Sequence, residues 1–96
     1  MPSFAPRSEA IKKQEQLVKS EIELRHAIYN NYSDKKLDKA ANNYRDSQLS
    51  LLKAQIHVIK DKAFQNKPIT SKIDNLEAKI EMWRARSVEE ILNSFK

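Results

Sequence analysis

Titratable side chains are abundant in this chain, but their spacing does not form a catalytic or metal site. In an antiparallel hairpin that turns near residue 33, His26 lies opposite roughly residue 40 and His57 opposite roughly residue 9, so the two histidines cannot meet. Carboxylates alternate with lysines, which is typical of solvated helix faces and not of the apolar settings that raise a carboxyl pKa for acid–base chemistry. We therefore expect no catalytic residue, no metal site, no cofactor and no enzyme activity.

The composition supports the same exclusions. The chain has 96 residues with no cysteine and no glycine. Thiolate zinc sites and glycine-rich phosphate loops are therefore excluded, and tight β-hairpins are disfavoured. No run approaches the roughly 18 apolar residues of a membrane span, and the N-terminus lacks a signal-peptide core. We expect no membrane span and a cytoplasmic, intracellular protein.

The basic residues are better organised than the acidic ones. If the first two helices are antiparallel, the start of the first, the end of the second and the loop that follows share one end of the molecule. This basic end carries the whole net charge of +5, against only Glu9 and Asp61. Its basic members are Arg7, Lys12, Lys13, Lys60, Lys62, Lys67 and Lys72. Such a cluster suits phosphates or an acidic protein, although Phe64 is the only aromatic residue there for stacking on bases.

Two further groups are candidate partner contacts. Glu21 and Arg25 lie four residues apart within an apolar stripe, where they form either an edge ion pair or a polar contact that fixes register or receives a partner. Trp83 lies on the seam of the last long helix, flanked by Arg84 and Arg86. It is either a core anchor or an interface anchor.

Three amphipathic helices are predicted to position these residues. Residues 1–7 contain two prolines and no periodicity, and are predicted to be a flexible arm, whereas residues 8–96 form a single helical domain. Helices are expected over about 9–30, 35–66 and 71–94, with a turn at residues 30–34 and a stop at Pro68. Residues 87–90 resemble a capping box, so the third helix either bends near Arg86 or continues; we expect it to continue.

Apolar spacing of three and four defines the faces of these helices. Helix one carries two lines, Ile11, Val18, Ile22 and Tyr29, and beside them Leu17, Leu24 and Ile28. A stripe this wide predicts contact with two neighbours. Helix two carries Leu37, Ala41, Tyr44, Leu51 and Val58, with Gln48 and Gln55 on the same seam. The glutamines either find polar partners at a wet edge or specify register. The expected fold is all-α: an antiparallel long helical hairpin with a third helix, as a three-helix bundle or a coiled coil.

Two families share parts of this pattern. Residues 15–60 resemble the Rho-effector homology-region hairpin of protein kinase C-related kinases through Tyr32-Ser33, Lys36-Leu37, Ala40, Asp46-Ser47, Leu51 and Gln55-Ile56. That family often carries Gly-Ala in its first helix, where this chain has His26-Ala27. The likeness implies a two-helix finger that docks on a small GTPase.

The second likeness is to microtubule-interacting-and-transport domains. It rests on Leu37, Ala40, Tyr44, Ser47 and Leu51, with Ile80 and Trp83-Arg84-Ala85-Arg86 as part of the third helix. It implies a groove between helices that binds a short partner helix.

The leading hypothesis is a non-enzymatic helical protein–protein interaction module, a GTPase-binding or helix-binding adaptor. Three wide apolar stripes in one small domain also predict self-association as a dimer or burial against another protein. The alternative is a nucleic-acid-binding protein that uses the basic end. Its affinity would fall steeply with salt.

Overall fold

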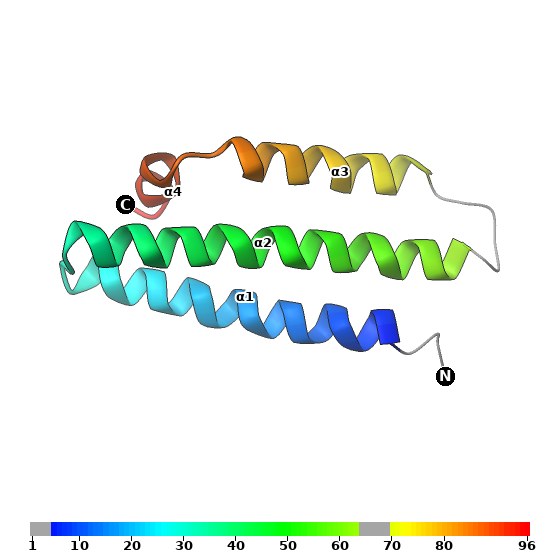
Figure 1. Ribbon diagram of the computed structural model, residues 1–96, viewed down its shortest axis with the longest axis horizontal. Helices are drawn as coiled ribbons and strands as arrows, with labels where there is room; N and C mark the ends of the chain where they lie inside the picture. Colours follow the sequence, from blue (N-terminus) through cyan, green and yellow to red (C-terminus); the bar gives the residue numbers. More distant parts are fainter. Residues whose placement is uncertain (1–4, 64–69) are drawn as a thin grey trace.

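The computed structural model describes residues 5–63 and 70–96, which form four helices and no strand (Figure 1). The helices are α1 (Ala5–Tyr29), α2 (Asp34–Ala63), α3 (Thr70–Ala85) and α4 (Val88–Ser94). The predicted all-α fold class is thus confirmed. Within the described ranges, no helix combines the length and the apolar character that crossing a membrane requires.

Helix α2 is the centre of the molecule. It packs against α1 on one side and α3 on the other, and α4 lies near its first turns (Figure 1). The other pairs of described helices meet only marginally. The molecule measures 49 × 26 × 16 Å, and α1 and α3 lie on either side of α2 with little contact between them (Figure 1). The three long helices therefore form a flat layer, not a closed bundle.

The turn between α1 and α2 forms where the sequence predicts it. Asn31 has a left-handed backbone with φ of 52°, which asparagine tolerates better than most residues. The Tyr32 N–H donates to the carbonyl of Ala27 at 3.1 Å, and the Asn31 N–H to that of Ile28 at 3.2 Å, which is the Schellman pattern. Ser33 Oγ then accepts the backbone N–H three residues on at 3.4 Å and caps α2. The two long helices are consequently antiparallel neighbours.

Two helix boundaries differ from the prediction. Helix α1 begins at Ala5, so residues 5–7 of the predicted arm are helical; Pro6 fits because the first turn has no use for its missing N–H. The third helix does not continue to residue 94, but ends at Ala85. Ser87 caps α4 by accepting the backbone N–H of Glu90 at 3.1 Å. The predicted end of helix two near residue 66 and the stop at Pro68 lie outside the described residues.

Two apolar cores lie on α2. The first joins α1, α2 and α4 around Leu24, Ala41, Tyr44 and Ile91. The second joins α2 and α3 around Leu52, Ile56 and Ile80. The half-buried Trp83 packs against both cores, with its ring edge-on to Tyr44 at a centroid distance of 5.7 Å.

Only one of the two apolar lines on α1 is covered. Leu24 is fully buried, and Leu17 and Ile28 pack beside it against the first core. The other line, Ile11, Val18, Ile22 and Tyr29, is 47–87% exposed. Helix α1 thus contacts two neighbours, α2 and, through the first core, α4, but the second line takes no part in that core, and α3 packs on the far side of α2. We call these four residues the outer stripe.

Candidate functional site

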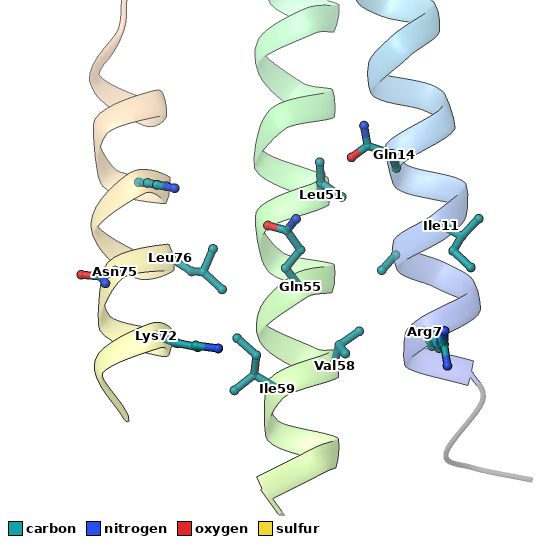
Figure 2. A pocket seen from close by; sticks show the side chains of 12 residues that line it. Arg7, Ile11, Gln14, Leu51, Gln55, Val58, Ile59, Lys72, Asn75 and Leu76 are labelled. Carbon is teal, nitrogen blue, oxygen red and sulfur yellow. The ribbon is translucent and has the colours of Figure 1, made fainter. Parts of the chain in front are cut away.

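A groove lies between α1 and α3, with α2 as its floor (Figure 2). Its volume is about 630 Å³. Helix α2 contributes Leu51, Gln55, Val58 and Ile59; α1 contributes Arg7, Ala10, Ile11 and Gln14; and α3 contributes Lys72, Asn75, Leu76 and Lys79. The groove lies at the end of the layer where α1 begins and α2 approaches its C-terminus.

Helical periodicity explains why these residues meet. On each helix they recur at spacings of three and four and therefore share one face. Figure 2 shows Leu76 and Lys72 projecting from α3 toward α2, and Ile59 projecting from α2 toward α3. Helix α2 separates the groove-lining faces of α1 and α3, because both of these helices pack on α2 and meet each other at most marginally.

The groove combines an apolar floor with basic walls. Leu51, Val58, Ile59 and Leu76 provide the apolar surface, and three amides, Gln14, Gln55 and Asn75, add donors and acceptors. The charged lining residues are Arg7, Lys72 and Lys79, with no carboxylate among the residues that line it. An apolar floor between cationic walls matches a ligand that is apolar on one face and anionic at its edges.

The opposite end of the layer carries a short helix. Helix α4 packs Ile91, Leu92 and Phe95 onto the first core and carries Glu89 and Glu90 in its first turn. The Arg25 guanidinium lies 4.9 Å from the centre of the Phe95 ring. Arg25 is eighteen residues, about five helical turns, beyond Arg7, so both lie on the same side of α1. A short amphipathic helix thus packs on α2 at the end of the layer opposite the groove.

Only two of the described residues of the predicted basic end are among those that line the groove. Arg7 and Lys72 lie in opposite walls of the groove. Lys12 and Lys60 are exposed and Lys13 is half-buried, but none of the three lines the groove. Of the remaining predicted members, the Lys62 side chain and the whole of Lys67 lie outside the described residues.

The predicted partner contacts are for the most part structural. Arg25 Nε and Glu21 Oε2 are 3.6 Å apart, with side chains 62% and 42% exposed, which is the edge ion pair. Trp83 is a core anchor that joins the two apolar cores. Arg84 is exposed and pairs with Glu81 at 3.0 Å.

Arg86 has a structural position at the α3–α4 break. Its guanidinium lies over the Trp83 ring at 4.6 Å, and its carbonyl accepts a hydrogen bond from Arg45 Nη1 at 2.8 Å. A second Arg45 nitrogen donates to Asn42 Oδ1 at 2.7 Å. Arg45 therefore fixes the break between α3 and α4 to the central helix.

The two histidines lie on exposed helix faces of the described chain, far apart in the sequence. His26 and His57 are both exposed. His26 lies beside the turn, edge-on to Tyr32 at 5.7 Å. No group of three histidine or carboxylate side chains in residues 5–63 and 70–96 is close enough together to hold a metal ion.

The sequence prediction missed most of the groove. Lys79, Asn75 and Gln14 were not candidates, because each looks like an ordinary exposed position of its own helix. The available signal was the spacing of Lys72, Asn75 and Lys79, which share one face of α3 without a carboxylate between them.

Comparison with known proteins finds no protein family, no curated protein and no solved structure that matches this chain.

Proposed function

We propose that the protein is a non-enzymatic interaction module whose groove binds an acidic amphipathic helix of a partner protein. The observation that carries the proposal is the apolar floor of the groove between cationic walls that hold no carboxylate. The apolar side of the ligand helix packs on Val58, Ile59 and Leu76, and its flanking carboxylates pair with Arg7, Lys72 and Lys79.

The shape of the groove favours a helix over the other candidate partners. The groove runs between helices, and the packing of α4 on the other end of α2 supports a helix as its ligand, since α2 already binds one short amphipathic helix there. A GTPase that docks on a two-helix finger needs free faces on both helices, whereas α3 and α4 cover part of α2. Nucleic acid would find cations here, but the described aromatic residues lie toward the other end of the layer, where α4 packs.

The first prediction is that the positively charged groove selects a negatively charged peptide over a positively charged one. Two synthetic helical peptides of equal length serve as probes, both with leucines at i, i+3, i+4 and i+7, one flanked by glutamates and one by lysines. Fluorescence anisotropy should show binding of the acidic peptide only. Lys72→Glu with Lys79→Glu should reverse the preference, because opposite charges must meet across the groove.

A matched variant separates the groove from overall charge. Lys35→Glu with Lys53→Glu makes the same change in net charge at exposed positions outside the groove, and should leave the preference intact. Equal effects of the two variants, or no binding of either peptide, would contradict the proposal. Tight binding of a single-stranded oligonucleotide that weakens steeply with salt would instead favour the nucleic-acid alternative.

A further inference from the structure

The outer stripe of α1 is an apolar line without a cover in the described structure. Ile11 is 53% exposed, Val18 47%, Ile22 59% and Tyr29 87%. At 100° per residue these four positions fall within a narrow band on the side of α1 opposite the buried Leu24, and at its N-terminal end the band meets the groove, because Ile11 also lines the groove. Helix α1 also forms one edge of the layer (Figure 1), and each of the four side chains is about half exposed or more. Large exposed apolar side chains aligned on one helix face make that face a candidate interface.

The order of residues along this stripe is symmetric. Ile11 and Tyr29 are each nine residues from Ser20, and Val18 and Ile22 are each two residues from it. When two identical helices pair antiparallel with the twofold axis level with Ser20, Ile11 of one copy meets the partner's Tyr29, and Val18 meets the partner's Ile22. Each apolar side chain of one copy therefore meets an apolar side chain of the other.

The charges beside the stripe obey the same symmetry. Glu15 and Arg25 are each five residues from Ser20, and they flank the stripe on opposite sides. In the antiparallel pair Glu15 therefore lies at the level of the partner's Arg25, diagonally across the line where the two outer stripes meet. The two side chains are long enough to form an ion pair there, and the twofold symmetry makes this contact twice. Glu15 is exposed, and the Arg25 side chain is 62% exposed although it contacts both Glu21 and the Phe95 ring.

We propose that two copies of this chain pair antiparallel through the outer stripes of α1, with the twofold axis at the level of Ser20. A second copy is the occupant that the pattern specifies, because an isologous interface must be self-complementary in both apolar contacts and charges. The pair extends the flat layer edge to edge from three long helices to six. The axis is normal to the layer, so both grooves open on the same face of the dimer.

The second prediction tests the ion pairs by charge exchange. In Glu15→Arg every interface contact of this kind becomes Arg–Arg, and in Arg25→Glu it becomes Glu–Glu. Sedimentation equilibrium from micromolar to millimolar concentration should show each variant dimerising about tenfold or more weakly than the unmodified chain, since two favourable pairs become repulsive. An equimolar mixture of the two variants should regain the dimer, because each arginine of the first variant then meets a glutamate of the second across the interface.

Absence of cysteine from the chain allows the orientation to be tested directly. Ile11→Cys mixed with Tyr29→Cys should form the mixed disulfide under mild oxidation in preference to either symmetric one. A parallel pair would link each variant to itself. A monomer throughout the concentration range, or symmetric disulfides alone, would overturn the proposal.

Two exposed positions provide the folding control. Ile22→Glu places a charge in the stripe and should abolish the dimer, whereas Met82→Glu, 46% exposed on α3, should not. Both variants should retain the helical circular dichroism of the unmodified chain. Neither lies in the groove, so binding of the acidic peptide tests the proposed function independently.

Discussion

Among the described side chains of α1, Leu24 is the largest that is fully buried. It is fully buried, and its neighbours in the first core include Ala41, Tyr44 and Ile91, so it joins α1 to both α2 and α4. In a chain of this size the entire free energy of unfolding is about 5–15 kcal/mol, so one core side chain is a substantial fraction.

The third prediction follows from this burial. Leu24→Ala should lower the free energy of unfolding by about 2–5 kcal/mol, because it removes apolar contacts and leaves a cavity in the first core. Met82→Ala, at an exposed position of α3, should change it by less than about 0.5 kcal/mol. Urea unfolding followed by circular dichroism measures both. An effect of Leu24→Ala no larger than that of the control would show that the first core does not hold α1 on α2.

Gln48 illustrates what the sequence predicts about a single residue and what only the structure shows. Its place on the seam of α2 follows from spacing, and so does its need for a hydrogen-bond partner. In the structure its Nε2 donates to Tyr44 Oη at 3.0 Å, one turn earlier on the same helix. Gln55, one heptad on, instead lines the groove. Two equivalent seam positions thus have different environments because α4 covers one end of α2 and leaves the other open.

At the scale of the elements, the break between α3 and α4 is the feature that shapes the molecule. Continuous helix would carry residues 88–95 along the edge of the layer and away from the first core. The break lets α4 turn inward, so that Ile91 is fully buried. It is fixed by one local contact, the Ser87 cap, and by one long-range contact, the hydrogen bond from Arg45 to the carbonyl of Arg86.

The fourth prediction concerns the cap. Ser87→Ala should destabilise the chain by about 1 kcal/mol, because the Glu90 N–H loses its acceptor at 3.1 Å, and Ser87→Asp should restore most of the loss. Hydrogen exchange should accelerate at Glu90 and Ile91 more than at amides in the middle of α2. Uniform acceleration throughout the chain, or none, would contradict a role for Ser87 in starting α4.

Helices could be predicted from the sequence, and some of their ends could not. The turn at residues 30–34 follows from asparagine, serine and aspartate chemistry that acts within a few residues. The capping pattern at Ser87 is equally visible, but its effect depends on Arg45, 41 residues away, which no local pattern indicates. The groove was missed for the same reason, since it exists only where faces of three helices converge.

At the scale of the whole molecule, the flat layer explains why so much apolar surface stays uncovered. The Cα radius of gyration is 15.5 Å, whereas a compact domain of this length has about 12.5 Å. In a closed three-helix bundle α3 would cover the second apolar line of α1. In this layer it cannot, and the side of α1 opposite the buried Leu24 remains for a second copy. The wide apolar stripes in the sequence indicate that a further packing contact is needed. They do not indicate whether the partner is in the same chain or in another.

The fifth prediction is the shape of the dimer in solution. Pairing through the outer stripe places two layers edge to edge, so the dimer should be about twice the 26 Å width of one protomer and somewhat longer than its 49 Å length, because Ser20 lies nearer the turn end of α1 and the two copies are staggered. Small-angle X-ray scattering of the unmodified chain at high concentration should therefore report a flat plate of nearly equal length and width. Ile22→Glu should scatter as the narrow single layer at the same concentration. A rod with a maximum dimension near twice 49 Å would place the contact at the ends of the helices. A compact particle would require the layers to stack face to face over the groove. Either shape would rule out the α1 edge as the dimer interface.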